Sequence, residues 1–221
     1  MMERPSLPKR ALARVLNAIT WVGNGYAPPF SSELLRSYSL RELTRRSAAV
    51  TELAKVIEAD LGERDGHLLL GFASLWNGCQ VCALGHIYAG NLAHFRDRGE
   101  LLAVDEQALS RLMRVSTDAE LLEYSERCLA GPGEARILGL VRRLYQIKLT
   151  GADDGVDEQP GDSEMLAAAI SAYDWINHCT IYSEGERPPL IAFSRLNQHF
   201  LLRARYAAAR RAAGGPPQTS A

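Results

Sequence analysis

The chain has 221 residues, enough for one large domain that buries a core without disulfide support. Its 25 basic and 26 acidic side chains leave a formal charge of −1, which gives no electrostatic reason to expect binding to nucleic acid or to an anionic membrane surface. The first eight residues lack the apolar stretch of a signal peptide, so we expect a soluble, cytoplasmic protein.

Apolar residues recur at helical spacing along most of the chain, and no convincing alternation of apolar and polar residues is present. This pattern predicts an all-α, single-domain helical bundle over residues 1–213. The remaining tail, 214–221, is rich in Gly and Pro and is expected to be disordered.

The first helix is predicted from Ser6 to about Trp21, and the glycines and prolines of residues 23–29 then form a loop. Ser39 and Glu42 have the spacing of a capping box, in which each side chain satisfies a free backbone N–H group of the helix start. The helix that they open is expected to end near Gly62.

Residues 66–95 contain no Asp, Glu, Lys or Arg. So long a neutral stretch resembles a membrane span, but Asn77 and Gly78 interrupt it in the middle with a turn signal. We therefore predict a hairpin of two buried helices over 66–96, one ending at about Trp76 and the other beginning at about Cys79.

The second half of the chain also has a helical pattern. Shorter helices are expected after Asp105, after Thr117 and from Gly133 to about Leu149, followed by an acidic loop over 151–162 and two long helices over 163–182 and 189–212.

Cys79, Cys82 and His86 occupy the start of the second hairpin helix. At roughly 100° per residue the three side chains share an arc of about 60° on one helix face. Cys79 lies in the first turn, where free N–H groups and the helix dipole stabilise an anion, so we expect a thiol pKa below its ordinary value. His86 lies one turn beyond Cys82 and can accept the thiol proton.

The other cysteines and histidines have weaker signals. Cys128 and Cys179 have no partner at motif spacing, and each is expected to be a small buried side chain. His94 falls outside the motif arc and is expected to pack in the core, and His199 is expected at the surface or in an interface. His178 is expected to pack in the core, with a place in the wall of the site as the alternative.

The order Asn-Gly-Cys-x-x-Cys-x-x-x-His, preceded by a helix, resembles the alkylhydroperoxidase D-like branch of the carboxymuconolactone decarboxylase superfamily. The resemblance is concentrated in residues 66–95, with weaker agreement of helical pattern over about 35–185. It implies an all-helical protein that forms homo-oligomers and reduces small hydroperoxides through its Cys-x-x-Cys pair, with no bound cofactor.

In this resemblance Cys82 corresponds to the thiolate that attacks the peroxide, and Cys79 to the thiol that then closes the Cys79–Cys82 disulfide. An external dithiol or a disulfide reductase reduces that disulfide again. His86 relays the proton.

One position departs from the family pattern. The family has a proton-relay Glu twelve residues before the first motif cysteine, where this chain has His67. Histidine can also accept and donate a proton near neutral pH, so a relay from His67 to His86 and Cys82 is chemically possible. Glu63, one turn before His67, is a candidate for the missing carboxylate.

Two readings from other classes stay open. Cys79, Cys82, His86 and His67 form a Cys2His2 set that could bind zinc tetrahedrally. The chain could also be a non-catalytic family member that acts as an interaction module with unused cysteines.

Overall fold

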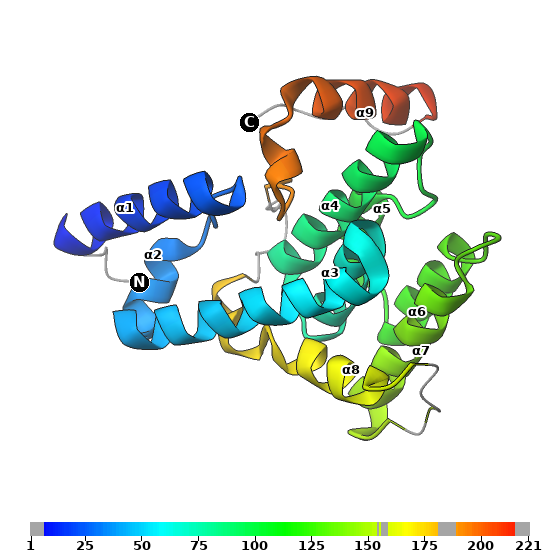
Figure 1. Ribbon diagram of the computed structural model, residues 1–221, viewed down its shortest axis with the longest axis horizontal. Helices are drawn as coiled ribbons and strands as arrows, with labels where there is room; N and C mark the ends of the chain where they lie inside the picture. The colour runs from blue at the N-terminus through cyan, green and yellow to red at the C-terminus, as the bar shows by residue number, and fades with distance from the viewer. Residues whose placement is uncertain (1–6, 154, 156–158, 181–188, 215–221) are drawn as a thin grey trace.

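The computed structural model describes residues 7–153, 155, 159–180 and 189–214, and every regular element in these residues is helical (Figure 1). The expected all-α fold is confirmed. The elements are α1 (Leu7–Asn24), α2 (Ser31–Ser37), α3 (Leu40–Trp76), α4 (Gln80–Arg98), α5 (Glu106–Val115), α6 (Asp118–Cys128), α7 (Ala135–Thr150), α8 (Asp162–Ser171), the 3-10 helices η1 (Asp174–Cys179) and η2 (Arg195–Gln198), and α9 (Phe200–Ala212).

The hairpin of α3 and α4 lies at the centre of the molecule (Figure 1), with α1 and α2 toward one end and α6 and α7 toward the other. Residues 66–95 are buried except Asn77, Gly78 and Gln80 at the turn. This burial confirms the prediction of two buried helices, and among the described residues no helix has the length and apolar character to cross a bilayer.

Small residues allow the two hairpin helices to approach closely. A Cβ atom added to Gly71 of α3 would lie 2.8 Å from the Ile87 side chain of α4, and one added to Gly90 would lie 3.1 Å from the Arg64 carbonyl oxygen. The contact at Gly71 leaves no room for a methyl group, and the one at Gly90 would require the neighbouring atoms to move. The glycines therefore set the separation of the helices that carry the candidate site.

Helix α3 begins with the expected capping box of Ser39 and Glu42 but does not end near Gly62. Gly62 instead has φ 80° and ψ 166°, a backbone conformation open almost only to glycine, and helical structure resumes after it. The chain bends so sharply that a Cβ atom on Gly66 would lie 3.2 Å from Cα of Glu58. The bend therefore brings Glu58 beside the first turn of the buried hairpin.

The predicted short helices are present, and their starts follow the expected caps. Asp105 accepts a hydrogen bond from the Ala108 N–H at the start of α5, and Thr117 and Glu120 form the capping box of α6.

The helix predicted over 163–182 is wrong in its extent, because α8 ends at Ser171 and a separate 3-10 helix, η1, follows. Tyr173 and Asn177 bond to the hairpin instead of continuing a helix: the Tyr173 hydroxyl contacts His86, and the Asn177 amide donates to the Asn77 carbonyl oxygen. The end of the predicted helix, 181–182, lies outside the described residues.

The helix predicted over 189–212 begins only at Phe200. Two backbone N–H groups before this helix donate to other partners. The Phe193 N–H group donates to the Gly85 carbonyl oxygen at 3.0 Å, and the Ala192 N–H group donates to the Asn197 side chain at 3.2 Å. The predicted disordered tail lies outside the described residues except for Gly214.

A buried polar network joins α9 to α4 and α5. The Glu106 carboxylate accepts hydrogen bonds from the Asn91 amide at 2.7 Å and from the Tyr206 hydroxyl at 2.8 Å. Arg210 donates to the Tyr206 oxygen at 2.7 Å and to the Val104 carbonyl oxygen at 2.9 Å. The network fixes the C-terminal helix to the far end of the hairpin.

Candidate functional site

The site begins at the turn between α3 and α4. Gly78 has φ 79°, which lets the chain reverse within two residues of Trp76. Cys79 becomes the N-cap of α4, and its N–H group donates to the Ser74 carbonyl oxygen at 3.0 Å. The turn thus fixes Cys79 one residue before the helix that carries Cys82.

Cys79 and Cys82 form a disulfide, with their Cα atoms 5.3 Å apart. Both residues are 0% exposed. The sulfurs are therefore paired and shielded from solvent in this form of the protein.

His86 lies one turn after Cys82 on α4, and its Nδ1 atom is 3.0 Å from Nδ1 of His67 on α3. Both histidines are buried. Two nitrogens at this distance share one proton, since one must donate and the other accept. The hairpin thus brings together the four residues singled out in the sequence: the two cysteines pair with each other, and the two histidines pair with each other.

Tyr173 extends the histidine pair. Its hydroxyl oxygen lies 2.6 Å from Nε2 of His86, and its side chain is buried. His86 therefore uses both ring nitrogens, one toward Tyr173 and one toward His67.

A carboxylate stands at the other end of the pair, and it belongs to Glu58. Oε1 of Glu58 is 3.6 Å from Nε2 of His67, and the Glu58 side chain is 39% exposed. Glu63, the candidate from the sequence, instead contacts Arg96 at 2.7 Å. The groups thus follow one another from the interior to the surface as Tyr173, His86, His67 and Glu58.

Burial keeps these histidines neutral. It lowers the pKa of His67 from 6.5 to about 4, and burial together with the neighbouring His67 lowers the pKa of His86 well below its ordinary value. Burial raises the pKa of the Tyr173 hydroxyl. Burial and the nearby Glu63 charge raise the pKa of the Glu58 carboxyl. Near neutral pH each ring carries a single N–H group.

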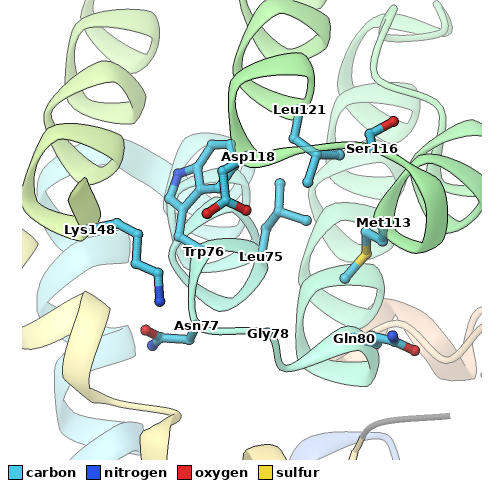
Figure 2. Close-up of a pocket in the computed structure, with 10 residues that line it drawn as sticks. All are labelled: Leu75, Trp76, Asn77, Gly78, Gln80, Met113, Ser116, Asp118, Leu121 and Lys148. Carbon is cyan, nitrogen blue, oxygen red and sulfur yellow. The ribbon is translucent and has the colours of Figure 1, made fainter.

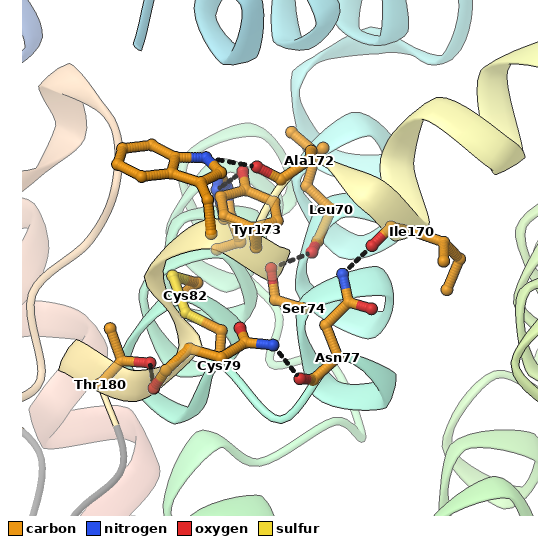
Figure 3. Close-up of a disulfide and its surroundings, with 12 residues drawn as sticks. Leu70, Ser74, Asn77, Cys79, Cys82, Ile170, Ala172, Tyr173 and Thr180 are labelled. Atoms are coloured by element: carbon orange, nitrogen blue, oxygen red, sulfur yellow. Dashed lines mark hydrogen bonds between the residues drawn. A yellow bond between two sulfur atoms is a disulfide. The ribbon is translucent and has the colours of Figure 1, made fainter. Parts of the chain in front are cut away.

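The segment from α8 through η1 encloses the disulfide (Figure 3). The Asn77 side-chain amide donates to the Ile170 carbonyl oxygen, and the Asn177 amide donates to the Asn77 carbonyl oxygen at 2.5 Å. These bonds attach the enclosing segment to the residue just before the turn.

Phe193 forms a further wall, against the same stretch of α4. Its ring contacts the His86 ring with centroids 5.3 Å apart and stacks on Tyr26 with centroids 4.5 Å apart. A Cβ atom on Gly85 would lie 2.6 Å from the Phe193 ring. Only glycine at position 85 leaves room for this ring beside His86.

A cavity of about 240 Å³ opens next to the turn (Figure 2). Its lining includes Trp76, Asn77, Gly78 and Gln80 from the hairpin, with Asp118 and Lys148 from α6 and α7. Neither cysteine and neither histidine of the site lines it. The cavity therefore adjoins the site without reaching its sulfurs.

The remaining histidines and cysteines lie outside the site. His178 is exposed, which contradicts its predicted core position, and its Nε2 atom lies 3.0 Å from Ser37 Oγ and 3.2 Å from Cys179 Sγ. The 3-10 helix η1 carries this residue and buries Ile176 instead of His178. Cys128 and Cys179 are free and half-buried, not buried as predicted. His94 is buried and His199 is exposed, as predicted.

The zinc reading is not favoured by this arrangement of the four candidate ligands. Thiolate ligands must be free, whereas both sulfurs are bonded to each other here. Nowhere in the described part of the chain do three or more His, Cys, Asp or Glu side chains form a group that could hold a metal ion. Metal binding by the reduced protein stays a prediction.

No family model matches the sequence, and neither the curated proteins nor the solved structures include one with significant similarity to it. The resemblance to the alkylhydroperoxidase D-like branch thus rests on the motif residues and their spacing.

Sequence reasoning missed two residues of the site. Tyr173 falls in a stretch rich in aromatic and amide residues, and that composition was its only signal. Glu58 had no signal, because its contact with His67 depends on the bend at Gly62.

Proposed function

We propose that the protein is a thiol-dependent peroxidase, or a closely related disulfide oxidoreductase, of the alkylhydroperoxidase D-like kind. The observation that carries the proposal is the Cys79–Cys82 disulfide one helical turn before a buried histidine that is hydrogen-bonded on both ring nitrogens. A buried structural disulfide would not need a proton-carrying group so close in the chain.

The reaction starts from the reduced pair. Cys82 passes its proton to His86 by way of the Tyr173 hydroxyl, which is bonded to Nε2 of His86. The thiolate attacks the O–O bond, so that a sulfenic acid forms on Cys82 and an alkoxide leaves. The alkoxide takes the proton back from His86 and becomes an alcohol. Cys79 then attacks the sulfenic sulfur and releases water, which closes the disulfide.

His86 is the proton acceptor and donor of this scheme, and His67 positions it. The neutral rings suit the task, because a histidine already protonated near neutral pH could not accept the thiol proton. Because both sulfurs have no exposed surface, an oxidant reaches them only through a local opening of the structure, which restricts the proposed substrate to a small hydroperoxide.

The proposal implies a dithiol or a disulfide reductase as the partner that restores the thiols. We also propose the cytoplasmic location and the homo-oligomeric state expected from the sequence, and a reaction that uses no bound cofactor.

The test is a single stoichiometric dose of hydrogen peroxide or of an alkyl hydroperoxide given to the reduced protein. We expect loss of two hydrogen masses from the 66–95 region of the wild type, and a stable sulfenic acid on Cys82 in Cys79→Ser. Cys82→Ser should not consume peroxide rapidly. Mass spectrometry after alkylation of the free thiols measures all three.

The matched control is Cys128→Ser, because Cys128 is a free, half-buried cysteine of α6. It should behave as the wild type, with the fold of every variant verified by circular dichroism. If Cys82→Ser consumes peroxide as fast as the wild type, the proposed function is wrong.

A further inference from the structure

The histidine pair is part of a row of groups that ends at the protein surface. From inside to outside the separations are 2.6 Å between Tyr173 and His86, 3.0 Å between His86 and His67, and 3.6 Å between His67 and Glu58. Tyr173, His86 and His67 are all buried, whereas the Glu58 side chain at the end of the row is 39% exposed. The row therefore connects the buried site to solvent.

Each ring nitrogen of the two histidines faces a different neighbour in the row. A neutral ring has one N–H donor and one acceptor, so the protons can all point toward Glu58 or all point toward Tyr173 with the heavy atoms in the same places. Moving one proton through the row switches one arrangement into the other. Such a switch needs no ionised histidine, which burial disfavours.

We propose that Glu58, His67, His86 and Tyr173 form a proton path that supplies the buried sulfur released when the Cys79–Cys82 disulfide is reduced. Glu58 is the outer end of the path and Tyr173 is its inner end. The inference rests on the proposed function and assigns roles to residues outside the motif. Tyr173 is placed at the inner end because its hydroxyl contacts Nε2 of His86 and because it lies among the residues around the disulfide (Figure 3).

The reductive half of the cycle is the half that needs a proton from solvent. An external thiolate attacks one sulfur of the pair, its electron pair forms the mixed disulfide, and the electron pair of the broken S–S bond stays on the other sulfur. The attacking thiol has already released its proton to solvent. In the oxidative half, by contrast, the thiol proton returns to the alkoxide within the site.

The path supplies the missing proton in one concerted shift. The Glu58 carboxyl gives its proton to Nε2 of His67, and His67 gives its Nδ1 proton to Nδ1 of His86. His86 in turn gives its Nε2 proton to the Tyr173 oxygen, and the Tyr173 hydroxyl gives its own proton to the released sulfur. The thiol is then complete and Glu58 is a carboxylate, which solvent reprotonates. The contact of 3.6 Å between His67 and Glu58 is too long for a hydrogen bond, so a small movement of the half-exposed Glu58 side chain or one water completes the path.

The experiment follows reduction of the oxidised protein by dithiothreitol at neutral pH, with alkylation and mass spectrometry of the 66–95 region. Glu58→Gln and Glu58→Ala should slow the reduction at least about tenfold, the lower end of what a positioned acid or base contributes. Glu52→Gln is the control, because Glu52 is an exposed residue of the same helix paired with Lys55. It should be reduced at the wild-type rate.

Chemical rescue separates a proton path from a structural role. Sodium formate should restore reduction of Glu58→Ala, where a small carboxylic acid can occupy the space of the lost side chain, but not of Glu58→Gln, where the amide fills that space. Sodium chloride at equal ionic strength should restore neither.

Two results would overturn the path: wild-type rates in both Glu58 variants, or slow variants that formate does not rescue. The assay needs no peroxide, so it also separates this inference from the proposed function. A protein whose reduction depends on Glu58 but whose thiols never react with peroxide keeps the path and loses the peroxidase activity.

Discussion

At the scale of single residues, the two buried histidines couple the stability of the protein to pH. The folded protein holds the pKa of His67 at about 4, whereas the ordinary value is 6.5. Between these values the unfolded chain binds a proton that the folded protein does not bind. The free energy of unfolding should therefore fall as the pH decreases through this range, and His86 should contribute in the same direction.

We expect wild-type protein to lose about 2 kcal/mol more of its free energy of unfolding than His67→Gln when the pH is lowered from 7 to 5. The Gln side chain can still bond to His86 but cannot titrate. Urea unfolding at both pH values measures the difference, and His199→Gln, at an exposed histidine, should follow the wild type. Parallel losses in His67→Gln and the wild type would contradict the assigned cause.

The spacing of residues in the sequence was sufficient to predict the part of the site that lies within one hairpin. Cys79, Cys82 and His86 belong to a single helix start, and local turn chemistry at Asn77 and Gly78 fixes that start. Tyr173 joins the site across 87 residues of sequence, and only the packed structure shows that its hydroxyl reaches His86.

At the scale of elements, the bend within α3 determines which carboxylate approaches the site. A straight helix would place Glu58 about two and a half turns away from His67 along the axis, and the bend at Gly62 removes that separation. The sequence indicated a helix end at this glycine, which is a reasonable reading of the residue type. It did not show that the chain continues as helix in a new direction, because that outcome depends on packing against the hairpin.

Gly62→Ala should lower the free energy of unfolding by about 1–3 kcal/mol, the cost of placing a side chain in this backbone region. No atom lies within 4 Å of the position of an added Cβ at Gly62, so the loss would report backbone strain rather than a clash. Gly23→Ala in α1 is the matched control, since its Cβ also meets no atom within 4 Å and its φ is ordinary. Thermal or urea unfolding compares the two, and equal stability would show that the bend is not strained.

The difference between local and long-range contacts also explains which helix ends could be predicted. The starts of α3, α5 and α6 were predicted because their caps lie within four residues of the helix. The end of α8 and the start of α9 were not, because their backbone and side-chain groups bond to α4 and to the turn before it.

At the scale of the whole molecule, the C-terminal helix depends on one buried carboxylate. Burial raises the pKa of Glu106, and the Tyr206 hydroxyl and the Asn91 amide satisfy its Oε2 atom. Removing one of these donors leaves a buried acceptor with fewer bonds, which costs more than the bond itself contributes.

Tyr206→Phe should therefore lower the free energy of unfolding by about 1–3 kcal/mol and weaken the attachment of α9. Tyr145→Phe provides the control, because Tyr145 packs its ring on Trp76 outside this network. Hydrogen exchange of the α9 amides and urea unfolding compare the Tyr206→Phe and Tyr145→Phe variants. An unchanged protection of α9 in Tyr206→Phe would contradict the role of the network.

The complete burial of the sulfur pair has a consequence for how the protein responds to its surroundings. A disulfide without accessible surface exchanges with bulky thiols only after a local opening of the segment that encloses it. The rate at which a bulky thiol reduces the disulfide is then limited by how often that segment opens. We therefore expect a bulky thiol to reduce the protein more slowly than a small dithiol of equal potential.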